Sequence, residues 1–193
     1  MLSIHKSMTV TDLLDGCRRG DPKAQRALYE RVAPRMLGVC FRYVHDRAEA
    51  EHVMVGGMVK VFGKLNQYLG EGSFEGWIRR IMINESLMYI RKNKALYVEV
   101  DIESVGLEPE YDELREMESD ELVQMIGELP MGYRTVFNLY AIEGYNHQEI
   151  SELLGISEST SKSQLCRARK LLQTRLATLH QRELTQQVNH GNS

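Results

Sequence analysis

Apolar residues recur at three- and four-residue steps along most of the chain. An α-helix has about 3.6 residues per turn, so this spacing places them along one side of helices. In the first half of the chain the positions concerned are Leu13, Leu14, Ala24, Ala27, Leu28, Val32, Leu37, Cys40, Phe41 and Val44. No segment alternates between apolar and polar residues for long enough to predict a sheet. We therefore predict an all-α protein with two helical domains.

Capping residues divide the N-terminal half into separate helices. Asp21-Pro22 fits an N-cap followed by proline at the first helical position. A second helix is expected from about Ala48 to Leu65, and the glycines that follow predict a loop. Ser73 would cap the next helix, which carries Phe74, Trp77, Ile78, Ile81, Met82 and Leu87. The N-terminal half thus predicts a bundle of about four helices, with Trp77 in its core.

Composition narrows the class of protein. The 193 residues are 42% hydrophobic and 26% charged, as in one or two ordinary soluble domains. No stretch approaches the ~20 apolar residues that cross a bilayer, and the N-terminus lacks the features of a signal peptide. We expect a cytoplasmic protein without membrane contact. Cys17, Cys40 and Cys166 are too far apart to predict a disulfide framework or a metal site, and we expect them reduced and mostly buried.

Charge is distributed unevenly along the chain. Between Ala95 and Glu121 eleven acidic residues and one basic residue give a net charge of −10, so the rest of a chain whose total is −3 carries +7. We interpret this acidic segment as a linker, with a helix starting near Tyr111. Two basic clusters flank it: Arg79, Arg80, Arg91, Lys92 and Lys94, and Lys162, Arg167, Arg169, Lys170, Arg175 and Arg182. The natural hypothesis is that a polyanion binds both clusters. The alternative is that the charged residues only form solvated faces of helices.

Residues 146–172 have the pattern of a helix-turn-helix. Asn146 and Glu149 form a capping-box variant, Gly155 ends the first helix, and Ser157 caps the second. The inward side of the second helix is expected to hold Leu165, Ala168, Leu171 and Leu172. A plain helical hairpin is the alternative, but it would not require a polar face with Lys and Arg and no acid. A helix-turn-helix presents its second helix to the major groove of DNA.

Two longer motifs carry a family resemblance. The first is Leu129-Pro-Met-Gly-Tyr-Arg-Thr-Val-Phe-Asn-Leu-Tyr-Ala-Ile-Glu-Gly144, followed by Tyr145-Asn-His-Gln-Glu-Ile150 and Ile156-Ser-Glu-Ser-Thr-Ser-Lys-Ser163. It resembles region four of the extracytoplasmic-function sigma factors of bacterial RNA polymerase. The second, Gly72-Ser-Phe-Glu-Gly-Trp-Ile-Arg-Arg-Ile-Met-Ile-Asn-Glu-Ser86, resembles the promoter-melting part of region two. The matches run from about Leu13 to Leu176, apart from the linker, in the family's order.

The resemblance implies domains and partners. It implies a region-two helical domain at 8–95, the acidic linker at 96–120, a region-four helix-turn-helix domain at 121–182, and a polar tail at 183–193, which we expect to be frayed from about Gln181. The implied partners are promoter DNA and core RNA polymerase, through its clamp coiled coil and flap, and an anti-sigma factor is a further candidate. The family implies no catalytic residue, cofactor or metal, and we expect a monomer when free.

The same resemblance assigns DNA contacts. It implies that the helix-turn-helix reads the upstream (minus-thirty-five) element as duplex, with readers at Lys162, Ser163, Cys166 and Arg167. We expect phosphate contacts from Arg169, Lys170 and Arg175. The N-terminal domain would bind one unpaired strand of the downstream (minus-ten) element through the loop 67–73 and through Tyr68, Ile81, Asn84, Arg79 and Arg80. An aromatic wall and an amide suit a pocket for an extruded base, and Tyr68 has no obvious core to fill.

One motif departs from the family. Where relatives carry polar and acidic residues that grip core polymerase, this chain has His52, Val55 and Gly56, then Gly57 and Met58. Each glycine costs about 1 kcal/mol relative to alanine in a helix interior, which predicts a bent or unravelled turn. We expect core polymerase to be bound differently or weakly at this position.

Three functions remain open on the sequence alone. The first is a sigma factor that recruits core polymerase and melts promoter DNA, and the second is a sigma-like DNA-binding regulator that has lost normal core binding. The third is an interaction protein held compact by an inhibitor. An enzyme is disfavoured, since Gly70-x-Gly72 is no phosphate loop and the histidines are scattered. His52 and His147 are interpreted as surface or capping residues.

Overall fold

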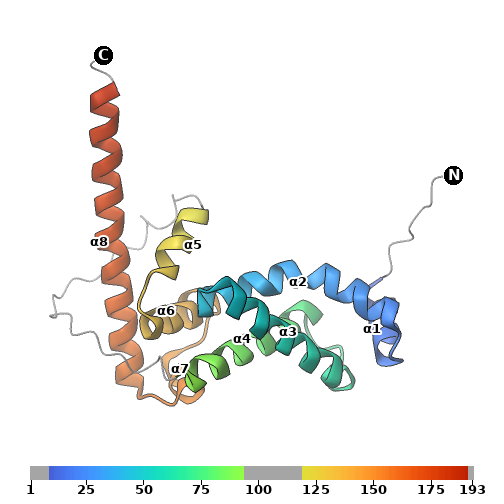
Figure 1. The fold of residues 1–193 in the computed structure, drawn as a ribbon. Helices are drawn as coiled ribbons and strands as arrows, with labels where there is room; N and C mark the ends of the chain where they lie inside the picture. The colour runs from blue at the N-terminus through green and yellow to red at the C-terminus, as the bar shows by residue number, and fades with distance from the viewer. Residues whose placement is uncertain (1–8, 94–118, 191–193) are drawn as a thin grey trace. The chain divides into compact units, whose positions relative to one another are not determined.

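The computed structural model describes residues 9–93 and 119–190 and divides the chain into two compact units, Met1–Asn93 and Lys94–Ser193. Within the described residues every regular element is helical and there is no strand, which confirms the predicted all-α class (Figure 1). Most of the predicted linker, including the helix start near Tyr111, lies outside the described residues.

The N-terminal unit is the predicted four-helix bundle. It consists of α1 (Val10–Arg18), α2 (Pro22–Val44), α3 (Arg47–Lys64), a short 3-10 turn η1 (Leu65–Gln67) and α4 (Phe74–Lys92). The backbone N–H of Lys23 donates to Asp21 at 2.9 Å, and that of Gly76 donates to Ser73 Oγ at 3.3 Å. Both predicted N-caps are therefore confirmed.

The core of this unit lies between α2, α3 and α4, which pack on one another in pairs (Figure 1). The largest of its fully buried side chains are Met36, Tyr43, Val61, Leu65, Ile78, Met82 and Ile90. Burial of a side chain of this size contributes about 1.5–3 kcal/mol, so the three long helices form one packed body. Trp77 is only half-buried, because it lies at the edge of this core.

The glycine pair on α3 does not break the helix, so the predicted unravelling of this turn is wrong. α3 is continuous from Arg47 to Lys64. Gly57 is buried against α4, where a Cβ would collide with the Met82 sulfur, so its missing side chain allows close packing of the two helices. A Cβ on Gly56 would meet nothing within 4 Å. The two glycines therefore have different physical roles.

The C-terminal unit consists of α5 (Ser119–Gly127), α6 (Met131–Phe137), a π-helical turn η4 (Asn138–Ile142), α7 (His147–Leu154) and α8 (Glu158–His190). Buried Arg134 on α6 donates to the carbonyls of Gly127 at 2.6 Å and Leu129 at 3.2 Å, and burial lowers its pKa to about 10. Arg134 thus satisfies carbonyls left unpaired where α5 ends.

The last helix is longer than predicted. α8 continues to His190, so the frayed tail expected from Gln181 is wrong up to that residue. The segment is polar, but it is built from good helix formers such as Gln, Arg, Glu and Leu and holds neither Gly nor Pro before Gly191. The high helix propensity of these residues therefore accounts for a helix that has no apolar stripe.

Candidate nucleic-acid interface

The predicted helix-turn-helix is present in α7 and α8. The Asn146 side chain accepts from the Glu149 N–H at 2.9 Å, and a Glu149 carboxylate oxygen accepts from the Asn146 N–H at 2.8 Å, which completes the capping box. Gly155 ends α7 in the left-handed region with φ 68°, a conformation that favours glycine. Ser157 Oγ accepts from the Thr160 N–H at 3.0 Å and so caps α8.

α8 presents a polar face beyond this turn. Leu165, Ala168 and Leu172 are buried against the rest of the unit, as predicted, whereas Leu171 is only half-buried. The residues expected to read DNA divide into an exposed set, Lys162, Ser163 and Cys166, and a half-buried set, Arg167, Arg169 and Lys170. The exposed set recurs at three- and four-residue steps, so it forms one outward stripe.

Two of the half-buried arginines are oriented by tyrosines. Arg167 donates from Nη1 to the hydroxyl of buried Tyr133 at 3.4 Å. The guanidinium of Arg169 lies 5.6 Å from the ring centroid of Tyr140, which in turn stacks on His147 with a centroid distance of 4.7 Å. These contacts hold the guanidinium groups in place before any ligand binds.

His147 links the start of α7 to α8. Its Nδ1 lies 2.9 Å from the Oγ of Ser161, which is fully buried. Burial, together with the charges of Lys162 and Arg169, lowers the pKa of His147 and favours the neutral imidazole. His147 is the first residue of α7, but the cap is Asn146 and His147 is half-buried, so its interpretation as a capping or surface residue is wrong.

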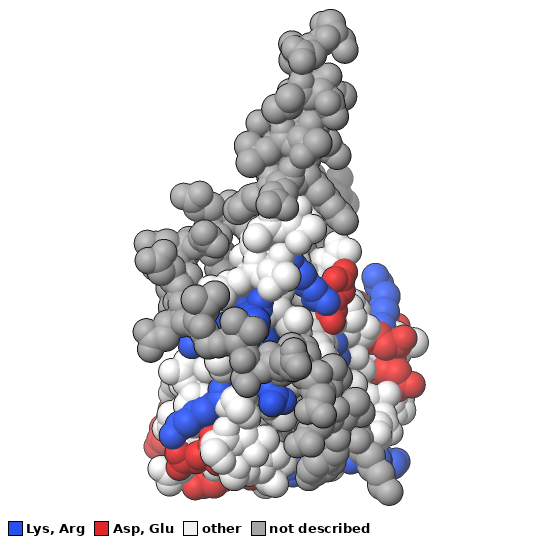
Figure 2. Space-filling model, turned by 90° about the vertical axis from the view of Figure 1, so that its left-hand side faces the viewer, with Lys and Arg blue, Asp and Glu red and all other residues white. Residues whose placement is uncertain are grey.

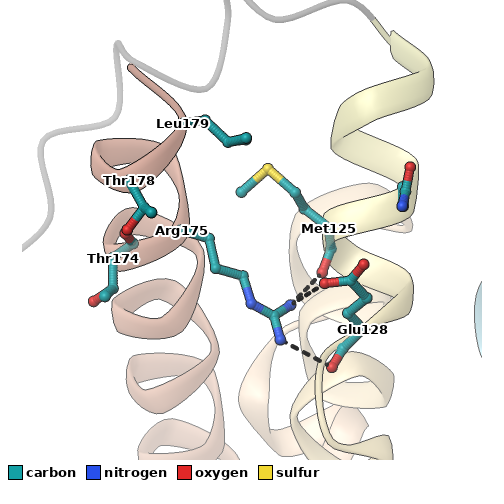
Figure 3. A pocket seen from close by; sticks show the side chains of 7 residues that line it. Met125, Glu128, Thr174, Arg175, Thr178 and Leu179 are labelled. Atoms are coloured by element: carbon teal, nitrogen blue, oxygen red, sulfur yellow. Dashed lines mark hydrogen bonds and ion pairs between the residues drawn. The ribbon is translucent and has the colours of Figure 1, made fainter. Parts of the chain in front are cut away.

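Arg175 makes its contacts within its own unit, and its predicted phosphate contact stays a prediction. It donates to the main-chain carbonyls of Met125 at 3.0 Å and Glu128 at 3.3 Å, and it pairs with the Glu128 carboxylate at 3.5 Å (Figure 3). A pocket lined in part by Met125 and Leu179 separates α5 from α8 at this level (Figure 3). Arg175 therefore ties α5 to α8.

The cysteines differ in exposure. Cys17 and Cys40 are buried, whereas Cys166 is exposed on the polar stripe of α8. Burial raises the pKa of Cys40 to about 11 and also raises that of Cys17, so neither forms much of the reactive thiolate near neutral pH. Cys166 is therefore the accessible thiol of the chain.

In the N-terminal unit the candidate DNA residues lie on α4. Asn84 is exposed and Ile81, one turn before it, is half-buried. Arg80 is exposed and Arg79 is half-buried on a neighbouring face of the same helix. The amide of Asn84 carries both donors and an acceptor, so it can hydrogen-bond to a base edge.

The loop before α4 is held by Tyr68, which the sequence analysis misjudged. Tyr68 is only 9% exposed and packs on Phe74 and Trp77, with ring centroids 5.0 and 5.6 Å away. Its hydroxyl donates to the Gly72 carbonyl at 2.8 Å. The expectation that Tyr68 has no core to fill is wrong, because these aromatic rings form one around it. Leu69, the next residue, is 80% exposed.

The expected core-binding residues share one surface of α3. His52, Val55 and Gly56 are all exposed, and so is Val59, which is four residues beyond Val55. No acidic side chain occupies this turn of the helix. Where relatives carry polar and acidic residues, this surface of α3 therefore exposes the apolar side chains of Val55 and Val59.

The charged surface is mixed in sign. On the face shown in Figure 2, Lys and Arg side chains lie among Asp and Glu side chains. On α8, for example, Lys162 pairs with Glu158 at 3.3 Å. Over the residues that the structure describes, no group of three or more His, Cys, Asp or Glu side chains is placed to hold a metal ion, and no helix there is long and apolar enough to cross a membrane.

Comparisons with known proteins identify both units. Residues 28–96 match the family model "Sigma-70 region 2", and residues 119–172 match "Sigma-70, region 4", so the two matches together span more than half of the chain. The chain belongs to the sigma-70 family of RNA polymerase sigma factors. Its curated relatives place it in the extracytoplasmic-function (ECF) group, as the sequence motifs predict.

Several relatives match this sigma factor over almost their whole length. The RNA polymerase sigma-H factor of Pseudomonas aeruginosa is 27% identical over 180 residues, which cover 86% of this chain and 93% of that protein. The ECF RNA polymerase sigma-E factor of Haemophilus influenzae is 26% identical over 188 residues, covering 90% and 98%. A solved structure of the sigma factor RpoE from Bartonella quintana with the anti-sigma factor NepR is 21% identical, covers 79% of this chain and 96% of that one, and has a TM-score of 0.47.

Family membership answers the question that the sequence left open. The protein is a sigma factor for transcription initiation, and the comparisons do not favour a regulator without core binding. Sigma factors act by binding DNA and polymerase and not by catalysis.

Proposed function

We propose that this sigma factor reads the minus-thirty-five element as duplex with the outward stripe of α8. The observation that carries the proposal is the stripe of Lys162, Ser163 and Cys166 directly after a fully capped helix-turn-helix. An α-helix fits the major groove, where Lys and Arg donate to guanine and Ser contacts several bases. Arg167 adds a reader at the edge of the stripe, and Arg169 and Lys170 contact phosphates.

The N-terminal unit takes the minus-ten element as an unpaired strand. Asn84 supplies an exposed amide and Ile81 an apolar surface one turn away, while Arg79 and Arg80 add positive charge on α4. The loop 67–73 lies immediately before this helix. Because Tyr68 is buried, its role is to position the loop, and an extruded base meets the exposed residues around it.

Core polymerase binds the α3 surface of His52, Val55 and Gly56 through apolar contact. Val55 is 48% and Val59 is 66% exposed, and burial of such side chains is favourable without any ion pair. This surface therefore replaces the polar contacts usual in the family. Because these partners are cytoplasmic, we infer a cytoplasmic location for the protein, and we propose an anti-sigma factor as a further partner.

The accessible thiol of Cys166 provides a test. We expect iodoacetamide to modify Cys166 in the free protein, while Cys17 and Cys40 do not react because they are buried and their pKa values are raised. A duplex carrying the minus-thirty-five element should slow alkylation in proportion to the fraction of protein bound, as measured by mass spectrometry.

A scrambled duplex of equal length is the control. At a salt concentration that suppresses non-specific binding, it should leave the alkylation rate unchanged. Equal protection by both duplexes, or protection by neither, would contradict base reading by this face of α8.

A further inference from the structure

Helix α1 reaches the loop 67–73 through one side chain, that of Arg18. Arg18 Nη2 donates to the main-chain carbonyl of Tyr68 at 3.0 Å, although the two residues are 50 positions apart in the chain. The bond is partly shielded from water, and a carboxylate oxygen of Asp15, 3.6 Å from Arg18 Nη1, helps to orient the guanidinium. The match to region 2 begins at residue 28, so α1 lies before the matched residues.

The helix that carries Arg18 is itself held in place. α1 begins with a complete capping box, and its apolar residues Leu13, Leu14 and Cys17 are buried. It packs on α2 and on η1, the turn that ends directly before Tyr68. Arg18 therefore joins the loop to a fixed part of the N-terminal unit.

All three polar groups of Tyr68 take part in holding the loop. Its N–H donates to the Leu65 carbonyl at 3.3 Å, and its hydroxyl donates to the Gly72 carbonyl at 2.8 Å. Its carbonyl accepts from Arg18. This carbonyl belongs to the planar peptide unit that also contains the N–H of Leu69, so the bond from Arg18 fixes the plane from which Leu69 leaves the fold.

Leu69 is the side chain that this arrangement presents to solvent. It is more exposed than any other large apolar side chain among the described residues. The next residue, Gly70, has φ 85°, and a glycine leaves the backbone many other conformations. The direction of Leu69 is therefore set from the Tyr68 side, where Arg18 binds.

We propose that Arg18 is a positioning residue for recognition of the minus-ten strand: by holding the Tyr68 carbonyl, it directs Leu69 toward the unpaired bases. Leu69 packs on the face of an extruded base, as apolar side chains do in pockets for such bases. Arg18 itself does not contact DNA. The inference rests on the proposed role of the loop 67–73, and it adds α1 to the elements on which that role depends.

The test measures base preference with the full chain, core RNA polymerase and two promoter fragments. Both fragments carry an unpaired minus-ten segment, one with the cognate sequence and one scrambled, so that binding requires no opening. Arg18→Met keeps a long side chain and removes the donors. We expect it to lower the ratio of the affinities for the two fragments by about two- to tenfold, the range for one lost hydrogen bond. An unchanged ratio would overturn the proposal.

Arg19→Met is the matched control. Arg19 is the next residue and is exposed, and the hydrogen bonds by which it caps α1 come from its main chain, so the substitution leaves them intact. It removes the same charge, and the ratio should stay at the wild-type value. An equal fall in both variants, or an equal loss of affinity for both fragments in Arg18→Met, would show that Arg18 acts through charge or general stability and would overturn the proposal.

A double-mutant cycle separates positioning from a structural role. Leu69→Ala should lower the ratio without changing the melting temperature, because Leu69 is exposed. Adding Arg18→Met should then lower the ratio little further, since Arg18 acts through Leu69. Residues that act independently give additive losses, so additivity would contradict the proposal. An unchanged ratio in Leu69→Ala alone would contradict it as well.

Asn84→Ala distinguishes this inference from the proposed function. If Asn84→Ala lowers the ratio while Arg18→Met and Leu69→Ala do not, the inference fails and the proposed function stands. If the wild type shows no preference for the cognate segment, both fail.

Discussion

Replacing Asn84 with alanine is expected to weaken promoter opening by about 5- to 150-fold, equivalent to the 1–3 kcal/mol that one good base contact contributes. Asn84 is exposed on α4, so its loss opens no cavity in the core. Alanine is also the better helix former, so the thermal stability of the protein should be unchanged or slightly higher. Fluorescence of 2-aminopurine placed in the minus-ten element, in a complex with core polymerase, measures the loss.

Thr11→Ala is a suitable control for this variant. Thr11 is an exposed polar residue on α1, away from the candidate DNA residues in sequence, and its substitution should leave opening unchanged. Binding of Asn84→Ala to the minus-thirty-five duplex should also equal that of the wild type. If opening by Asn84→Ala were normal, Asn84 would have no part in holding the unpaired base.

Adding a methyl group at either of two adjacent glycines is expected to have opposite effects on stability. Gly56→Ala should raise the free energy of unfolding by about 1 kcal/mol, because the site is open and alanine favours the helix. Gly57→Ala should lower it by about 1 kcal/mol, because fully buried Met82 must move to admit the Cβ, and overpacking outweighs the helix preference. Urea denaturation of both variants checks the sign.

The two variants also serve as controls for each other. They are neighbours with the same chemical change, so they differ only in what the new methyl group meets. Equal stabilisation by both would show that α3 and α4 do not pack closely at Gly57. Close packing would then no longer explain why position 57 holds a glycine.

Local signals in the sequence predicted the helices well. The caps at Asp21, Ser73 and Asn146 depend on residues two or three positions away, so their partners are visible in the sequence itself. The same holds for Gly155, whose left-handed conformation ends α7. The helix-turn-helix and its inward and outward faces follow from these ends and from helical periodicity.

Contacts between distant segments were the source of the errors. Tyr68 is buried by Phe74 and Trp77, and periodicity does not show that a loop residue joins such a cluster. Arg175 is bound by the carbonyls of Met125 in α5 and of Glu128 just after it, 50 and 47 positions earlier, so its charge alone suggested a DNA contact. Gly57 needs Met82 on another helix for its explanation.

Permanganate reactivity of thymines in a promoter bound to core polymerase and this protein tests the central claim most directly, because permanganate oxidises unpaired thymines. The account predicts that thymines of the minus-ten element become reactive only when the protein is present, while those of the minus-thirty-five element stay unreactive. Unreactive minus-ten thymines in a complex that does form, or reactive thymines in both elements, would contradict the claim that one unit binds unpaired DNA and the other binds duplex.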